Sequence, residues 1–371
     1  MREPFLDRIE KRPLVCDGAM GTMLYAKGIP LNRCYDELNA SAPRLVKEVH
    51  LAYAKAGAEV LETNTFGANR YRLRNFGFDE RVRELNLEGA RLARDVAGDD
   101  LYVAGAVGPL GALLEPLGQV SPEAARAAFH EQIAALAEGG VDLIIIETMM
   151  DLQEARQALL AAREVGGFPV VVQMTVQSEG RTSTGTRAED FARALDEWGA
   201  DLVGVNCSAG PAAVEETLER MAGVTEKKLS AQPNAGLPST VEGRNVYLCS
   251  PEYMADYARR FIQAGARLVG GCCGTTPEHI KAIKAAVRSL SPQRARIAVE
   301  AATRPSAALA PVALAERSHL ARKLAAQQFP VLVEVVPPKG CDATKEVEGA
   351  QFRAQEQTWI FDENFTWRQI S

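Results

Sequence analysis

The sequence lacks the marks of a membrane or secreted protein. No apolar run approaches the about 20 residues that a membrane-spanning helix needs. Residues 1–13 are too charged to contain the apolar part of a signal peptide. The seven cysteines are an odd number in a long chain, unlike the paired cysteines of a secreted disulfide framework. We therefore expect a cytoplasmic protein whose thiols stay reduced, with no membrane partner.

Signatures of nucleic-acid and nucleotide binding are absent as well. The 371 residues carry a net charge of -6 and no basic patch with interleaved aromatic residues, so nucleic acid is not an expected partner. Neither the GxGxxG pattern of dinucleotide-binding folds nor a Walker A phosphate loop occurs. Histidine is scarce and falls in helix-like or linker stretches, where we interpret it as structural or surface: His50, His130, His279 and His319.

Apolar runs alternate with helix-like stretches between residues 13 and 290. The runs are continuous, as expected for parallel strands that are buried on both faces. Three helix-like stretches open with Ser or Thr followed by Pro-Glu, which is a helix start signal. Eight such units predict an α/β protein with a (β/α)8 TIM barrel, and the missing glycine-rich loop disfavours a doubly wound sheet. The predicted strands are 13–20, 58–64, 101–107, 141–146, 169–175, 201–207, 228–234 and 267–273, and the predicted helices are 41–57, 79–97, 121–139, 151–166, 188–199, 210–222, 250–265 and 276–290.

Composition changes after the predicted barrel of residues 1–290. Residues 291–329 are rich in Ala, Pro and Arg, and we interpret them as a linker. Residues 330–351 hold one strand-like run, and a lone strand is not stable by itself. Residues 352–371 are polar and aromatic without a period, and their origin stays open. The chain is thus predicted to be a barrel followed by a linker and an incomplete C-terminal segment.

Two adjacent cysteines close the last predicted strand. Glycines flank Cys272 and Cys273. Adjacent side chains of a strand point to opposite faces, so both thiols can bind one metal ion only if the backbone turns there, which glycine permits. Cys207 ends the sixth predicted strand, and the C-terminal ends of barrel strands meet at one mouth. Three thiols there indicate a zinc site with one position left open. The alternative is that they are small buried apolar residues, which the pairing and the flanking glycines disfavour.

An open position on zinc suits a thiol substrate. The metal would hold that substrate as a thiolate, so no catalytic base is required. Asp17 and Glu147 end the first and fourth predicted strands and are suited to receive the ammonium group of an amino acid. Their alternative role is helix capping or loop hydrogen bonding, which the apolar strand before Glu147 disfavours for that residue. Cys16 lies inside the first predicted strand, where we expect it to face away from Asp17.

The residues described so far leave two other classes of function open. A binding or scaffold protein with a purely structural zinc would need a fourth protein ligand, such as Cys34 or Cys249. A metal-free lyase or aldolase would need a lysine or histidine at a strand end, and the predicted strand ends hold neither.

Four segments resemble one known family. They are Asp17-Gly-Ala-Met-Gly-Thr22, Glu62-Thr-Asn-Thr-Phe-Gly67, Gly204-Val-Asn-Cys207 and Gly270-Gly-Cys-Cys-Gly-Thr275. In this order they resemble the homocysteine S-methyltransferase family, which includes the homocysteine domain of cobalamin-dependent methionine synthase and betaine–homocysteine methyltransferase. The resemblance spans roughly residues 5–290. It implies a (β/α)8 barrel, zinc held by Cys207, Cys272 and Cys273, and methyl transfer to the sulfur of homocysteine to give methionine.

The resemblance also implies a set of substrate-binding residues. Asp17 and Glu147 match family positions that bind the amino-acid end of the substrate. Asn64 and Thr65 lie in a second matching segment. Gly18 and Asn206 belong to the matching segments too, and we count them with the substrate-binding residues.

A second resemblance bears on the methyl donor. Residues 333–340 resemble the opening strand of methylenetetrahydrofolate reductase, and the likeness stops at about residue 351. Some bacterial proteins fuse these two enzymes, which implies methyltetrahydrofolate as donor, used directly or through a corrinoid protein in trans. The chain holds no Asp-x-His-x-x-Gly cobalamin signature. Betaine and S-methylmethionine stay open as donors.

Overall fold

The computed structural model describes residues 2–177, 180–208, 210–241 and 244–289, with short stretches beyond them at 316, 322, 325–326, 359–361 and 367–369. The chain divides into two units, residues 1–296 and 297–371. In the second unit, strands β11 (Trp359–Phe361) and β12 (Trp367–Gln369) pair antiparallel. The stub at 330–351 and most of the predicted linker and of the tail therefore lie outside the described residues.

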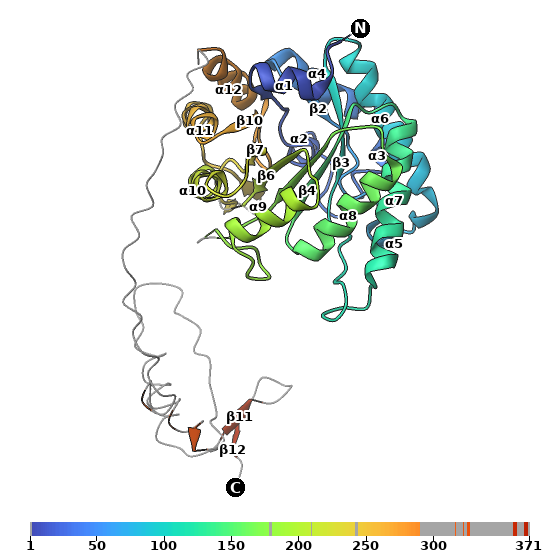
Figure 1. The fold of residues 1–371 in the computed structure, drawn as a ribbon. Coiled ribbons are helices and arrows are strands. Elements are labelled where there is room, and N and C mark those ends of the chain that lie inside the picture. The colour runs from blue at the N-terminus through green and yellow to red at the C-terminus, as the bar shows by residue number, and fades with distance from the viewer. Residues whose placement is uncertain are drawn as a thin grey trace. The chain divides into compact units, whose positions relative to one another are not determined.

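Eight parallel strands of the first unit form a barrel in the order β1-β10-β7-β6-β5-β4-β3-β2 (Figure 1). The first and second strands close it, since Glu59 N donates to Val15 O at 2.7 Å and Asp17 N donates to Val60 O at 3.0 Å. Each predicted strand overlaps one observed strand, so the predicted (β/α)8 barrel is confirmed. The strands are β1 (Leu14–Val15), β2 (Val60–Glu62), β3 (Tyr102–Val107), β4 (Leu143–Met149), β5 (Val170–Met174), β6 (Leu202–Cys207), β7 (Lys228–Pro233) and β10 (Ala266–Val269).

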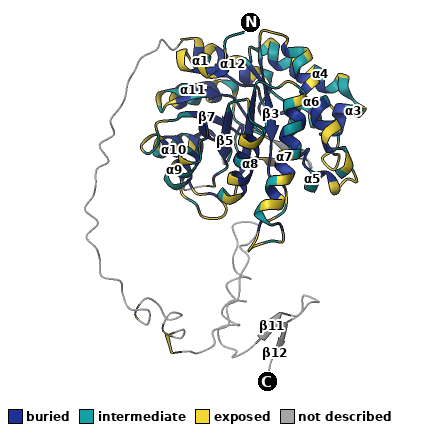
Figure 2. Ribbon diagram, turned by 45° about the vertical axis from the view of Figure 1, so that its right-hand side comes forward, coloured by how far each residue is buried: buried dark blue, intermediate teal, exposed yellow. Residues whose placement is uncertain are grey.

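Helices cover the outside of the barrel, with their buried sides toward the sheet and their exposed sides outward (Figure 2). All eight fall within predicted ranges, and their start signals act as expected. The side chains of Ser121 and Ser250 accept hydrogen bonds from the backbone at 3.2 and 3.3 Å, and a proline follows each serine. The helices are α4 (Pro43–Ala56), α6 (Val82–Ala97), α7 (Pro122–Glu138), α8 (Leu152–Val165), α9 (Ala188–Glu197), α10 (Pro211–Ala222), α11 (Pro251–Gln263) and α12 (Pro277–Ser289).

Several short elements were not expected from the sequence. They span one or two turns or three-residue strands, which is too short to show a hydrophobic period. Three of the helices lie in the segments that follow β1 and β2. The short elements are α1 (Phe5–Lys11), α2 (Met20–Ala26), α3 (Leu38–Ser41), α5 (Arg70–Arg74) and the hairpin of β8 (Ser239–Val241) and β9 (Arg244–Val246).

The core has an inner and an outer layer. Along each strand, side chains alternate between the barrel interior and the helix-facing side, as Leu14 and Val15 do on β1. Phe5 and Ile9 of α1 belong to the interior cluster, so this helix closes the end of the barrel where the strands begin. None of the described helices is long and apolar enough to span a membrane.

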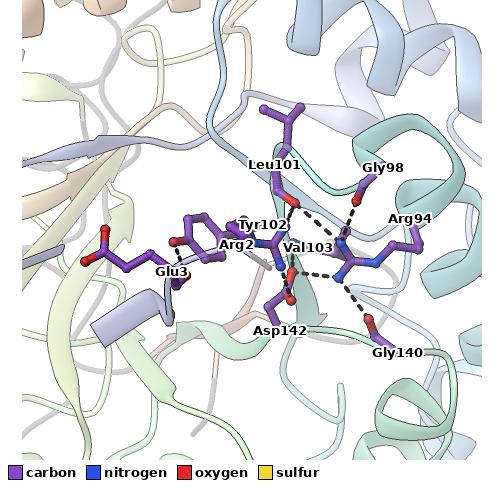
Figure 3. A network of polar contacts seen from close by, with 9 residues as sticks. All are labelled: Arg2, Glu3, Arg94, Gly98, Leu101, Tyr102, Val103, Gly140 and Asp142. Atoms are coloured by element: carbon purple, nitrogen blue, oxygen red, sulfur yellow. Dashed lines mark hydrogen bonds and ion pairs between the residues drawn. The ribbon is translucent and has the colours of Figure 1, made fainter. Parts of the chain in front are cut away.

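At the end of the barrel where the strands begin, one arrangement occurs three times among the described residues. An acidic residue just before a strand accepts a backbone hydrogen bond from the neighbouring strand and forms an ion pair with a basic side chain. Asp142 immediately precedes β4 and accepts a hydrogen bond from Val103 N of the neighbouring β3 at 2.7 Å. The guanidinium groups of Arg94, at 2.6 Å, and Arg2 bind the same carboxylate (Figure 3). These contacts leave Asp142 fully paired.

The same arrangement of an acid, a backbone N–H and a basic side chain occurs before two other strands. Asp201, before β6, accepts from Val170 N at 2.7 Å and pairs with Arg163 at 2.8 Å. Glu59, before β2, accepts from Val15 N at 3.3 Å and pairs with three basic side chains. Each acid therefore ties adjacent strands together and carries its own counter-ion.

Candidate active site

A cavity of about 540 Å³ opens at the opposite end of the barrel, among the loops that follow β1, β2, β4, β6, β7 and β10. Of the predicted site residues, all but Asp17 line this cavity: Gly18, Asn64, Thr65, Glu147, Asn206, Cys207, Cys272 and Cys273. Residues that lie up to 255 positions apart thus meet at one mouth, as the barrel topology requires.

The three predicted metal ligands converge at the base of this cavity. The Sγ atoms of Cys207, Cys272 and Cys273 all lie within 4.8 Å of one another, and the last two are 4.0 Å apart. Zinc–sulfur bonds of about 2.3 Å in a tetrahedral arrangement would place two sulfurs about 3.8 Å apart. The sulfur positions and the soft thiolate donors therefore fit zinc.

Glycines shape the turn that carries the adjacent cysteines. β10 ends at Val269, so Cys272 and Cys273 follow the strand rather than close it, which corrects the predicted boundary. A Cβ on Gly270 would lie 2.8 Å from Asp17 O. Gly274 has φ +80°, and a Cβ there would lie 2.1 Å from Cγ of Tyr247. The chain can bring both sulfurs to one side only because these positions lack side chains.

Proton sharing couples the three sulfurs. Cys272 and Cys273 donate hydrogen bonds to Cys207, which lowers the pKa of the Cys207 thiol to about 3. The same bonds raise the pKa of Cys273 to about 12 and that of Cys272 well above its ordinary value. The cluster thus accepts one negative charge readily, while a state with three thiolates needs a bound cation.

The proposed fourth cysteine ligands do not join this group. Among the described His, Cys, Asp and Glu side chains, neither Cys34 nor Cys249 lies within 4.8 Å of all three sulfurs. Cys34 lines the cavity elsewhere, with its Sγ 3.9 Å from Asp36, and burial raises its pKa to about 11. Cys341 lies outside the described residues.

Glu147 sits on the cavity wall with its carboxylate held by an amide. Asn206 Nδ2 donates to Glu147 Oε2 at 3.1 Å, while Asn206 Oδ1 accepts from Thr148 N at 2.7 Å. Burial, followed by the negative charges of Glu62 and Cys207, raises the pKa of Glu147 well above its ordinary value. Asn206 therefore holds the Glu147 carboxylate in position. This role gives a physical reason to count Asn206 among the site residues.

Asp17 lies below the cavity wall and is 2% exposed. Its Oδ2 accepts from Glu62 N at 3.0 Å, and Cys16 Sγ lies 3.7 Å from its Oδ1. The expectation that Cys16 faces away from Asp17 is therefore wrong. The reason is that the strand pattern ends at Cys16, which faces the barrel interior and still bridges Val60 of β2, so the alternation of side chains does not extend to Asp17.

Glu62 and Gln232 line the cavity but are absent from the predicted site residues. Glu62 Oε1 accepts from Gln232 Nε2 at 2.8 Å, and burial raises the pKa of this carboxyl. A signal for Glu62 was available, because it ends an apolar strand just as Glu147 nearly does. Gln232 carried no signal, since a glutamine in a weak strand is not distinctive.

The other predicted residues contribute mainly shape. Asn64 Nδ2 donates to Tyr35 O at 2.7 Å and Thr65 Oγ1 donates to Ala106 O at 2.8 Å, so both side chains bind their own scaffold. A Cβ on Gly18 would lie 2.6 Å from Thr275 Oγ1. These residues keep the loops after β1 and β2 closely packed.

The outer part of the cavity has a different chemistry from the sulfur and carboxyl part. The loops after β1 and β2 supply Tyr35, Phe66 and Phe76 there, together with Arg33 and Arg72. The Arg72 guanidinium lies 5.2 Å from the centre of the Phe66 ring and its Nε donates to Pro109 O at 2.8 Å. This region suits a flat or partly anionic second ligand.

The described histidines stay away from the cavity. His50 and His279 are buried on α4 and α12, and His130 is exposed on α7. Both ring nitrogens of His50 lack hydrogen-bond partners, and burial lowers its pKa to about 4. His319 lies outside the described residues.

Comparison with known proteins gives concordant matches. Residues 14–287 match the family model described as homocysteine S-methyltransferase. The methionine synthase of Mycobacterium tuberculosis is 35% identical over 314 residues, which are 80% of this chain and 26% of that protein. The Mycobacterium leprae methionine synthase is 35% identical over 301 residues, covering 76% and 25%. The chain therefore spans about a quarter of the length of these relatives.

A solved structure agrees over the barrel. The metallated form of the homocysteine methyltransferase MmuM from Escherichia coli superposes with a TM-score of 0.65 at 29% identity. The match covers 76% of this chain and 99% of that chain.

Proposed function

The chain belongs to the homocysteine S-methyltransferase family, and from this premise we propose that it methylates the sulfur of homocysteine to give methionine, with zinc as its metal. The family makes it a methyltransferase. The observation that carries the proposal is the meeting of Cys207, Cys272 and Cys273 on a cavity that is also lined by a buried carboxylate. Such a cavity can hold a thiol at one end and an ammonium group at the other.

The three cysteines would hold zinc. When bound there, zinc keeps a substrate thiol deprotonated at neutral pH, which is the form that attacks a methyl carbon. Cys207 is set at φ +58° where β6 ends, and Asn234 N donates to its carbonyl at 3.0 Å, which joins the ends of β6 and β7. The protein thus fixes the sulfur geometry through three strand ends.

The carboxyl side of the cavity would bind the amino-acid end of homocysteine. Within the described part of the chain, neither Asp17 nor Glu147 forms an ion pair with a basic side chain. Glu147 faces the substrate and Asp17 holds the end of β2 behind the cavity wall through Glu62 N. Asn206 orients Glu147, and Gly18, Asn64 and Thr65 shape the adjoining wall.

The methyl donor would enter through the outer part of the cavity. About 540 Å³ is within the range of pockets that hold drug-sized ligands, which is more than a four-carbon amino acid needs. Aromatic and arginine side chains there suit the flat ring and carboxylates of methyltetrahydrofolate, used directly or through a corrinoid protein in trans. Betaine and S-methylmethionine are the alternative donors.

A donor panel tests this function. The full chain, with its zinc content measured, is incubated with homocysteine and each of the three donors, with and without added corrinoid, and methionine is quantified. We expect methionine from at least one donor. Stoichiometric zinc with no methionine from any donor, and no change at a cobalt-substituted metal centre when homocysteine is added, would instead indicate a structural zinc in a binding module.

A further inference from the structure

Two neighbouring strands present amide side chains that hold carboxylates in the same way. Asn206 on β6 and Gln232 on β7 are register partners. Asn206 Nδ2 donates to Glu147 at 3.1 Å, and Gln232 Nε2 donates to Glu62 at 2.8 Å. Both carboxylates line the cavity that the sulfurs share. Glu62 therefore occupies a position equivalent to that of Glu147.

The orientation of Gln232 is fixed from the barrel interior. Gln173 on β5 donates through Nε2 to Gln232 Oε1 at 2.6 Å, so the Gln232 carbonyl oxygen is already used. The Gln232 amino group is thereby directed at Glu62 Oε1, which Cys16 Sγ also approaches at 3.4 Å. No hydrogen bond to the second oxygen, Oε2, is formed by any described residue. Glu62 thus has one oxygen bound to the scaffold and one left for a ligand.

Asp17 differs from these two glutamates. It does not line the cavity, it is 2% exposed, and its Oδ2 accepts a hydrogen bond from the backbone N of Glu62. It therefore supports the end of β2 from below. Its burial and its absence from the cavity lining make it a poor direct contact for a substrate.

The three acidic side chains at this end of the barrel have no cationic partner among the described residues. No basic side chain in the described part of the chain forms an ion pair with Asp17, Glu62 or Glu147. A primary ammonium group offers three N–H donors and can satisfy more than one carboxylate. The sulfurs lie on the same cavity, so a molecule with a thiol at one end and an ammonium at the other fits both groups.

We propose that Glu62 and Glu147 together bind the ammonium group of the thiol substrate, and that Asp17 is a positioning residue beneath Glu62. This inference rests on the proposed function for the identity of the substrate. It makes Glu62 a determinant of specificity for α-amino thiols over thiols that lack the amino group.

The test compares two thiols that differ by the amino group. Calorimetric titration of the zinc-loaded full chain gives Kd for homocysteine and for 4-mercaptobutanoate, without any methyl donor. For Glu62→Gln we expect the Kd for homocysteine to rise about tenfold to hundredfold, because a hydrogen bond to a charged group is lost. The Kd for 4-mercaptobutanoate should change less than about threefold. The partly exposed Glu88→Gln, outside the cavity lining, serves as a charge-matched control and should change neither value.

A second variant covers the case in which Glu62→Gln loses zinc or fails to fold. Gln232→Met keeps the Glu62 carboxylate but removes its donor, and should weaken homocysteine binding by a smaller factor than Glu62→Gln, again with little effect on 4-mercaptobutanoate. Equal weakening of both thiols, or an unchanged Kd for homocysteine at full zinc content, would overturn the role of Glu62. If the zinc-loaded wild-type chain binds no homocysteine, the proposed function fails instead.

Discussion

The two ends of the barrel treat acidic side chains in opposite ways. Where the strands begin, Glu59, Asp142 and Asp201 each accept a backbone N–H and pair with arginine or lysine. Where the strands end, the acids accept hydrogen bonds from amides, a thiol and the backbone, and within the described residues they have no ion pair. These are the acids at the ends of β1, β2 and β4 themselves: Asp17, Glu62 and Glu147.

Backbone strain is distributed in the same unequal way. Among the described non-glycine residues, positive φ occurs at Thr148, Cys207 and Ser208, all where β4 and β6 end. Each such residue costs on the order of 1–3 kcal/mol. Unpaired acids and strained backbone both lower stability, and they gather where a ligand can compensate for them. The barrel is thus stabilised at one end and prepared for binding at the other.

The largest expected effect is at the sulfurs. Cys207→Ala, Cys272→Ala and Cys273→Ala should each remove bound zinc and methyl transfer, because two sulfurs cannot hold the metal as three do. The loss should exceed the about 10–100-fold cost of changing a residue that merely holds a metal ligand in place. Zinc content after gel filtration and methionine formation measure it. Cys249→Ala, outside the sulfur group, should keep both, and full zinc in any of the three variants excludes that cysteine as a ligand.

At the other end of the barrel the expected effect is on folding. Asp142→Ala should lower the free energy of unfolding by about 2–3 kcal/mol, because Val103 N–H and two guanidinium groups lose their acceptor. Urea unfolding measures this, with Asp95→Ala as an exposed control that should stay within about 0.5 kcal/mol of wild type. Zinc content should not change. A loss of zinc at unchanged stability would contradict the separation of the two ends.

In contrast to Asp142→Ala, Glu147→Gln should impair the reaction with homocysteine without lowering the stability of the fold. We expect the KM for homocysteine to rise about tenfold to hundredfold, or kcat to fall, with zinc retained. The free energy of unfolding should not decrease, because an uncompensated buried carboxyl has been replaced by an amide of the same shape. Steady-state kinetics and urea unfolding on one preparation give both values. An unchanged kcat/KM would remove Glu147 from the site.

The fold could be predicted because each barrel unit repeats strong local signals. A continuous run such as residues 143–146 reads as a doubly buried strand, and Ser121-Pro122 reads as a helix start, whatever the rest of the chain does. The short helices α2, α3 and α5 could not be predicted, because one or two turns show no hydrophobic period and their positions depend on tertiary contacts. Of these helices, α2 and α5 supply residues to the cavity lining, so part of the cavity shape was hidden too.

The site was predictable where chemistry coincides with a strand end. Cys207, Cys272 and Glu147 stand out because polar or reactive side chains follow apolar runs. The relation between Asp17 and Glu62 was not predictable, because it depends on where β1 and β2 stop and on the register that joins them. One residue of strand length decides whether a side chain lines the cavity or supports it from below.

The smallest expected effect concerns a buried base that has no partner. Burial lowers the pKa of His50 to about 4, so the folded chain binds its proton less tightly than the unfolded chain, whose histidine titrates near about 6.5. The stability that neutral His50 permits is complete above that unfolded value and falls as the pH drops toward 4. At about pH 5.5 the loss should be about 1.4 kcal/mol relative to pH 8. The His50→Leu variant should not show this loss of stability between about pH 8 and about pH 5.5.

The difference between wild type and His50→Leu isolates this residue, because the acids at the barrel mouth titrate in both proteins. Their raised pKa values act with the opposite sign, since a folded chain that holds these protons gains stability as the pH falls. Urea unfolding of both proteins at the two pH values gives the double difference. A double difference of zero would mean that His50 reaches solvent or a partner when protonated, so that its burial sets no pH dependence.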